Sequence, residues 1–211
     1  MIIAVDGPAA SGKGTIARAL AARFGLPHLD TGLLYRAVGW WAHAHGADLD
    51  DEAEAVGVGC GFPPALLDDP ALRAEAAAAA ASRVSAHPAV REALLARQRG
   101  FAEQPGGAVL DGRDIGTVIA PGADAKLFVT ATPEVRAARR FAELRAAHPE
   151  LTLAQVLADI QGRDARDSGR SAAPLLRAPD AALLDTSEMG IGDAVRRAIA
   201  LVEVRTGPAS R

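Results

Sequence analysis

The chain has 211 residues, of which 49% are apolar and 23% are charged, as expected for a single well-packed soluble domain. Basic residues number 23 and acidic residues 26, so no excess of positive charge is available to bind a nucleic-acid polymer. The only cysteine is Cys60, which excludes an internal disulfide. The N-terminal apolar run has no cationic segment and stops at Asp6, so we expect neither a signal peptide nor a membrane span. These features predict a soluble, cytoplasmic protein.

The N-terminal residues predict a buried strand, a glycine-rich loop and a helix, in that order. Residues 2–5 are apolar and mostly β-branched, and a turn sequence follows them. Apolar residues spaced four apart predict a helix over 12–24, which Gly25 ends. Thr31 is placed to cap a second helix, which runs to about residue 41.

Further along the chain, the pattern alternates between helices and short apolar strands. Helices are predicted over 71–84, 88–101, 133–144, 153–160 and 191–204, and strands over 107–110, 126–129 and 182–184. This alternation predicts a parallel sheet covered by helices on both faces. Ligands bind at the carboxyl ends of such strands, where Asp6, Asp111 and Asp185 each lie.

Residues 7–15 read GPAASGKGT and match the phosphate-binding pattern G-x-x-x-x-G-K, with the usual serine or threonine displaced by one position. Glycines allow backbone N–H groups to approach phosphate oxygens, and the following helix directs its positive end at the same point. The lysine adds a mobile charge for the β and γ phosphates. The residues expected to bind ATP are Gly7, Pro8, Ala9, Ala10, Ser11, Gly12, Lys13, Gly14 and Thr15.

A phosphate-binding loop by itself is compatible with kinases, GTPases and motor ATPases. GTPases recognise guanine through an N-K-x-D element, which this chain cannot contain because it has no asparagine. Arginines that follow predicted strands, and others within 163–170, favour a small-molecule kinase. A nucleotide-binding module without catalytic activity is the alternative from a different class.

Several motifs occur in a fixed order along nearly the whole chain. They are GPAASGKGT, LDTGLLYR, ASRVSAHPAVREALLARQR, VLDGRDIGT, EVRAARR, IQGRDARDSGR and LLDTS. In these motifs the chain resembles the bacterial cytidylate kinases, a branch of the nucleoside monophosphate kinases. The resemblance implies a three-layer α/β/α P-loop NTPase fold and transfer of the ATP γ-phosphoryl group to CMP or dCMP, with Mg²⁺. We expect the protein to be a monomer. A kinase that prefers UMP or AMP is the nearest alternative.

The resemblance also implies roles for individual residues. It assigns CMP binding to Thr31, Tyr35, Arg36, Ser82, Arg91, Arg113, Asp114, Arg163, Asp167 and Arg170, and catalysis to Lys13, Arg113, Arg163 and Arg170. Arg139 and Arg140 are further candidates for the arginines that neutralise phosphate charge. A carboxylate at Asp114 that accepts from the exocyclic amine would select cytosine over uracil. Asp111 would hold Mg²⁺ through water.

Plainer interpretations exist for several of these residues. Thr31 also fits a simple helix cap, and Arg36 and Arg91 fit solvated surface positions. Asp111 before glycine also fits a turn. The segment over 153–170 fits an exposed helix with ion pairs between residues four apart, although Ser168-Gly169 suggests a bend and a hinge there.

The predicted organisation is one kinase domain over 1–211, with an acceptor-binding region at 31–85 and a mobile lid at 145–173. The resemblance is weakest over 46–71, where family members carry a longer insert rich in strands. Glycines and prolines here predict a shortened insert, a loop with at most one short regular element and no three-stranded sheet. We therefore expect activity to survive removal of 56–64.

Overall fold

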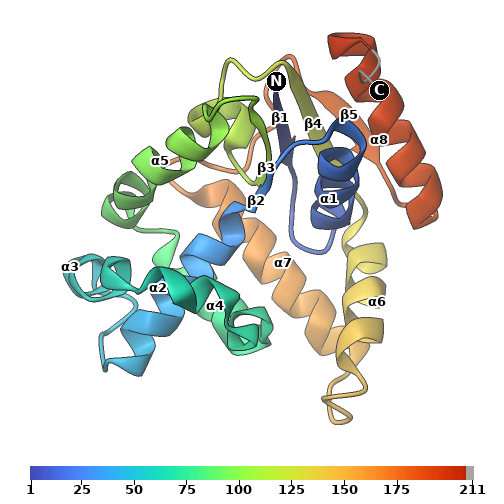
Figure 1. Ribbon diagram of the computed structural model, residues 1–211. Helices are drawn as coiled ribbons and strands as arrows, with labels where there is room; N and C mark the ends of the chain where they lie inside the picture. The colour runs from blue at the N-terminus through green and yellow to red at the C-terminus, as the bar shows by residue number, and fades with distance from the viewer. Residues whose placement is uncertain (208–211) are drawn as a thin grey trace. The chain divides into compact units, whose positions relative to one another are not determined.

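The computed structural model describes residues 1–207, and the chain forms two compact units (Figure 1). The first unit comprises Met1–Leu29 and Ala102–Arg211, and the second comprises Asp30–Phe101. None of the helices within 1–207 is both long enough and apolar enough to cross a lipid bilayer.

A five-stranded sheet organises the first unit, in the order β2-β3-β1-β4-β5. Its strands are β1 (Ile2–Asp6), β2 (His28–Asp30), β3 (Ala108–Gly112), β4 (Ala125–Thr130) and β5 (Ala182–Asp185). The pairs β1–β3, β1–β4 and β4–β5 are parallel, as predicted. Because β1 has β3 on one side and β4 on the other (Figure 1), the strand order reverses at the end of β1, the place where α/β sheets bind ligands.

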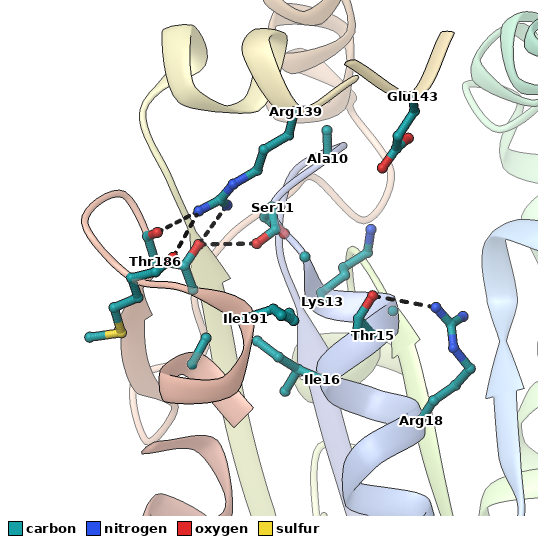
Figure 2. A pocket seen from close by; sticks show the side chains of 14 residues that line it. Ala10, Ser11, Lys13, Thr15, Ile16, Arg18, Arg139, Glu143, Thr186 and Ile191 are labelled. Atoms are coloured by element: carbon teal, nitrogen blue, oxygen red, sulfur yellow. Dashed lines mark hydrogen bonds between the residues drawn. The ribbon is translucent and has the colours of Figure 1, made fainter. Parts of the chain in front are cut away.

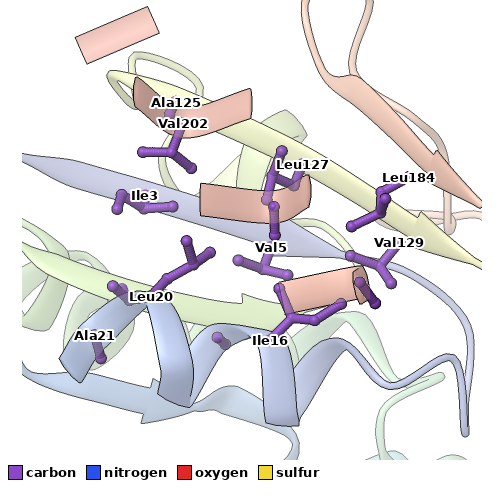
Figure 3. Close-up of a cluster of buried hydrophobic side chains, with 14 residues drawn as sticks. Ile3, Val5, Ile16, Leu20, Ala21, Ala125, Leu127, Val129, Leu184 and Val202 are labelled. Carbon is purple, nitrogen blue, oxygen red and sulfur yellow. The ribbon is translucent and has the colours of Figure 1, made fainter. Parts of the chain in front are cut away.

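The core of the first unit lies between this sheet and two helices, α1 (Lys13–Phe24) and α8 (Ile191–Thr206). Figure 3 shows Ile3, Val5 and Leu127 of the sheet packed against Ile16 of α1 and Val202 of α8. Branched side chains suit this position because they pack closely on a pleated surface. Full burial of each contributes about 1.5–3 kcal/mol to stability.

The other face of the sheet is covered as well, as the sequence predicted. Ala4, which points away from Ile3 and Val5, is 0% exposed, and so is Leu110 of β3. After β3 the chain forms a π-helical segment, η4 (Ile115–Ile119), which contacts β1 and β3.

Two further helices, α6 (Pro133–Leu144) and α7 (Leu153–Gly169), pack against each other through Ala137, Val156 and Ile160. The prediction that a helix ends near residue 160 was wrong, and no bend interrupts the helix before Ser168-Gly169. A capping box at Thr152 starts α7, and the helix then continues without interruption to Gly169, its last residue. Glycine is common at a helix end, so this residue marks the end of the helix and no bend within it.

The second unit is helical, with α2 (Thr31–Ala44), α3 (Glu52–Gly57), α4 (Glu75–Val84) and α5 (Pro88–Ala102). Helices α2 and α4 approach closely at Gly39 and Ala80. A Cβ atom at position 39 would lie 2.8 Å from the Cβ of Ala80, so only glycine allows this packing. The alanine-rich sequence of α4 therefore serves close contact between helices.

The region over 46–71 contains no strand, but the expectation of a loop there was incomplete. Besides α3 it forms three 3₁₀ turns, η1 (Gly59–Gly61), η2 (Pro64–Asp68) and η3 (Pro70–Arg73). Helix α3 forms because the Asp51 side chain accepts a hydrogen bond from the N–H of Glu54 at 3.0 Å. Gly57 is the last residue of this helix, and Gly59, Gly61, Pro63 and Pro64 follow it, so they do not prevent it.

Two predicted helix starts also differ from the structure. The predicted start of α4 at residue 71 falls in η3, and the helix itself begins at Glu75. Thr31 is the first residue of α2, whose N-cap is Asp30, so Thr31 does not serve as the cap.

Candidate active site

The segment 7–15 forms a loop between β1 and α1, the arrangement that the phosphate-binding motif requires. A Cβ atom at Gly7 would lie 2.0 Å from the carbonyl oxygen of Val129, so this position must be glycine. Gly12 caps α1 in the left-handed conformation, with a φ of 88°. The first N–H groups of α1 therefore lie at the loop, where they can donate hydrogen bonds to an anion.

A pocket of about 410 Å³ opens over this loop, and the first unit alone lines it (Figure 2). Six of the predicted ATP-binding residues contribute to the lining, namely Ala10, Ser11, Gly12, Lys13, Gly14 and Thr15, whereas Gly7, Pro8 and Ala9 do not. Arg139, Glu143, Thr186 and Ile191 line the opposite side. Met189 also lines the pocket. The pocket thus combines a polar loop with apolar side chains, as nucleotide sites do.

Thr186 connects this opposite side to the loop, and sequence analysis did not identify it as a site residue. Its hydroxyl is 3.2 Å from the carbonyl oxygen of Ser11 and 3.0 Å from that of Thr130. Arg139 donates to the Thr186 carbonyl at 2.6 Å and to the Thr186 hydroxyl at 3.0 Å (Figure 2). In the structure Arg139 therefore holds the segment after β5 in place.

Asp6, at the end of β1, holds the segment that follows β3. Its carboxylate is 4% exposed and accepts hydrogen bonds from the N–H groups of Ile115 and Gly116, each at 2.8 Å. Burial raises the pKa of Asp6 to about 6, against the lowering effect of the two N–H groups. The negative charge of Asp114, a predicted CMP-binding residue, raises this pKa further. The positive charge of Lys13, a predicted ATP-binding residue, lowers it, so Asp6 interacts with both residues.

Asp111 is 2% exposed, and its Oδ1 lies 2.7 Å from Nε2 of His28. A Cβ atom at Gly14 would lie 3.7 Å from Oδ2 of Asp111, so the second carboxylate oxygen faces the start of α1. No group of three or more histidine, cysteine, aspartate or glutamate side chains within 1–207 is arranged to hold a metal ion.

Three residues that the resemblance assigns to CMP form one cluster in the first unit. Nε of Arg113 lies 2.7 Å from Oδ2 of Asp167, and Nη1 of Arg170 lies 3.5 Å from Oδ1. Burial opposes ionisation of Asp167, but Arg113, Arg170 and Lys13 together hold its pKa below the usual value. Arg163, one turn earlier on α7, pairs with Asp159 at 2.9 Å.

The second unit brings together others of the predicted residues. The Arg91 guanidinium lies 5.3 Å from the centre of the Tyr35 ring and donates to the Ser85 carbonyl at 3.2 Å. Arg91 is 9% exposed, so the interpretation of this residue as a solvated surface arginine was wrong. Arg36 is half-buried and donates to the Leu72 carbonyl at 3.1 Å.

The remaining predicted CMP-binding residues are Thr31, Ser82 and Asp114, and each is buried or half-buried. Thr31 is buried at the start of α2, Ser82 is half-buried on α4, and Asp114 is 4% exposed immediately before η4. Buried polar side chains of this kind are unusual unless they are hydrogen-bonded or serve a binding site.

The chain is similar to known proteins along nearly its whole length. The family model described as Cytidylate kinase matches residues 3–204. A cytidylate kinase from Rhodopseudomonas palustris (strain HaA2) is 57% identical over 208 residues, which is 98% of each chain. One from Xanthobacter autotrophicus (strain Py2) is 60% identical over 205 residues, covering 97% of this chain and 98% of the relative.

A solved structure of an uncharacterized protein from Eubacterium ventriosum shares the fold, with a TM-score of 0.59 and 12% identity. It covers 97% of this chain and 99% of its own. The match to the family model and the identity with the two relatives establish kinship on their own. Together with the phosphate-binding loop and the arginine–aspartate cluster, they show that the chain belongs to the cytidylate kinase family.

Proposed function

We propose that the protein transfers the γ-phosphoryl group of ATP to CMP or dCMP, giving ADP and CDP or dCDP. The observation that carries this proposal is the phosphate-binding pocket, whose Lys13 also acts electrostatically on the cluster of Arg113, Asp167 and Arg170. Two sets of cations around two phosphate-binding positions are what phosphoryl transfer requires, because the reaction depends on positioning and charge neutralisation.

ATP would occupy the 410 Å³ pocket with its phosphates against residues 7–15. The N–H groups of the loop and Lys13 would bind the phosphate oxygens. Met189 and Ile191 of the pocket lining offer an apolar surface for the adenine ring.

Mg²⁺ is the metal that the kinase reaction calls for, and the residues fit it. Asp111 would hold the ion through water, since its Oδ2 faces the start of α1 beside the phosphate loop. When bound, Mg²⁺ would neutralise phosphate charge and orient the β and γ phosphates.

The proposed CMP-binding residues form two sets, one within each unit. In the first unit Arg113, Arg163 and Arg170 would neutralise phosphate charge, Asp167 would accept a hydrogen bond from the ribose, and Asp114 would accept one from the cytosine amino group. In the second unit the assigned residues are Thr31, Tyr35, Arg36, Ser82 and Arg91. Asp114 is the residue that would exclude UMP, because its carboxylate and uracil O4 are both hydrogen-bond acceptors.

The proposed organisation is a monomer that works in the cytoplasm, with residues 31–85 as the acceptor-binding region. Residues 145–173 form the proposed lid, whose closure would keep water away from ATP. The single half-buried cysteine is consistent with a reducing compartment.

An assay of ADP release with AMP, CMP, dCMP, UMP and GMP as acceptors tests the substrate assignment. We expect the highest kcat/KM with CMP and dCMP. A preference for UMP or AMP would contradict the assignment while leaving the kinase reaction itself intact.

A further inference from the structure

Arg136, on α6, is a buried cation that contacts three separate segments of the first unit. It is 3% exposed. Its Nε donates to the carbonyl of Ala131 at 2.9 Å, and its Nη1 donates to the carbonyl of Ala9 in the phosphate loop at 3.2 Å. The same guanidinium donates to both carboxylate oxygens of Asp164 on α7, at 3.0 and 2.5 Å. One planar group thus joins the phosphate loop to α7.

The part of the loop that Arg136 holds is conformationally strained. Ala10, the next residue after Ala9, has a φ of 58°, which lies in the left-handed region. This conformation costs an L-residue roughly 1–2 kcal/mol, so neighbouring contacts must maintain it. Ala10 also packs against the small apolar cluster between α6 and α7 that contains Val156. The loop is therefore fastened to this helix pair by a polar and an apolar contact.

Asp164, the partner of Arg136 on α7, lies close in sequence to residues proposed to take part in the reaction. Asp164 is adjacent to Arg163 on α7, and Asp167 and Arg170 follow it within two turns. Arg136 joins Asp164 to the loop, so this contact would set where these side chains stand relative to a nucleotide bound at the loop. Small errors in such placement are costly, because phosphoryl transfer depends on alignment.

We propose that Arg136 is a positioning residue, which holds the phosphate loop and the C-terminal half of α7 in the arrangement that phosphoryl transfer needs. This inference rests on the proposed function, because it concerns the rate of that reaction. Arg136 would act through the Ala9 carbonyl and Asp164 and would not itself contact a nucleotide.

Two variants separate this role from a purely structural one. Arg136→Lys keeps a charge to pair with Asp164, but an ammonium group cannot reproduce the planar fork that reaches Ala131, Ala9 and Asp164 together. Replacing the pair by Arg136→Met with Asp164→Leu removes both charges, and apolar substitution of a buried ion pair often leaves a protein stable. Arg23→Met is the matched control, because it removes an ion pair of 2.7 Å that joins α1 to Glu203 on α8.

The first measurement is kcat and the dissociation constant for ATP in folded samples of each variant. We expect kcat to fall by about tenfold or more in both Arg136 variants. The dissociation constant for ATP should change by less than about threefold, because Lys13 and the loop N–H groups remain. Arg23→Met should keep the wild-type kcat. Wild-type kcat in both Arg136 variants would overturn the proposal. So would a weaker binding of ATP with kcat unchanged, because the link to α7 would then have no effect.

Amide hydrogen exchange provides a readout that does not depend on which monophosphate is the acceptor. Addition of a non-hydrolysable ATP analogue to the wild-type protein should slow exchange in 153–169, and this effect should be lost in both Arg136 variants. An equal effect in wild type and variants would overturn the link between the loop and α7. Failure of the proposed function would show separately, as absence of CDP formation by the wild-type protein.

Discussion

Arg113 and Asp167 form an ion pair of 2.7 Å although they lie 54 residues apart in the chain. Arg113 follows β3 at the carboxyl edge of the sheet, and Asp167 lies in the last turns of α7. Arg170 contacts the other carboxylate oxygen at 3.5 Å, so Asp167 lies between two guanidinium groups that would otherwise repel each other. This arrangement keeps two guanidinium groups close together in the first unit.

The carboxylate of Asp167 should affect CMP more than dCMP, if it accepts a hydrogen bond from the 2′-hydroxyl. In Asp167→Ala the ratio of kcat/KM for CMP to that for dCMP should fall by roughly tenfold, the equivalent of about 1.4 kcal/mol. Any displacement of Arg113 and Arg170 in this variant should affect CMP and dCMP alike, so it cancels in the ratio. If kcat/KM falls equally for CMP and dCMP, Asp167 does not bind the 2′-hydroxyl and serves only to position Arg113 and Arg170.

Asp114 should control the choice between cytosine and uracil. Asp114→Ala should lose about 1–3 kcal/mol of discrimination between CMP and UMP, measured as the ratio of kcat/KM values. The KM for ATP should remain near that of the wild type, because the donor pocket does not include Asp114. If CMP and UMP lose the same activity, Asp114 supports the loop and does not recognise the base.

Asp6 should make folding stability depend on pH in a defined direction. Because burial raises its pKa in the folded protein to about 6, from 3.8, the folded state binds the proton more tightly than the unfolded state. The contribution of Asp6 to the free energy of unfolding is therefore greatest below about pH 4 and decreases as the pH rises to about 6.

The difference in unfolding free energy between the wild type and Asp6→Asn, measured by urea denaturation from pH 4 to 7, isolates this contribution. As the pH rises across this interval, the free energy of unfolding of the wild type should fall relative to that of Asp6→Asn. A difference that is constant with pH, or a carboxyl titration by NMR centred near pH 4, would contradict the assignment.

Phe62 changes the expectation for the shortened insert. Its ring is 7% exposed and lies 5.6 Å from the guanidinium of Arg97, so the segment 56–64 contributes to the core of the second unit. Removal of that segment should therefore destabilise the protein, contrary to what the glycines and prolines suggested. Phe62→Ala should lower the free energy of unfolding by about 3–5 kcal/mol. Thermal unfolding measures this loss, and a change below 1 kcal/mol would show that Phe62 is dispensable.

Sequence patterns predicted those parts of the fold that depend on near neighbours. The strand, loop and helix over residues 2–24, and the helices α6 and α8, follow from local periodicity and caps. The strand β2 was missed because three residues provide too little periodicity. The helix predicted over 153–160 ended too early because charged residues on a helix surface resemble a loop in composition.

The site shows the same division. The phosphate loop was predicted because its residues are contiguous, whereas Asp6 and Arg136 act through backbone groups far along the chain. Asp6 accepts from Gly116, 110 residues away, and Arg136 donates to Ala9, 127 residues away. No spacing rule in a single sequence reports such contacts, since they exist only once the sheet has formed.

Phosphorus NMR of the wild-type protein with ATP, Mg²⁺ and CMP tests the proposed reaction most directly, with Lys13→Ala as the comparison. We predict that the wild type forms CDP and ADP in equal amounts, and that folded Lys13→Ala forms neither, because Lys13 neutralises charge that develops on the transferred group. Appearance of ADP with inorganic phosphate and without CDP, or an unchanged rate in Lys13→Ala, would contradict the proposed transfer.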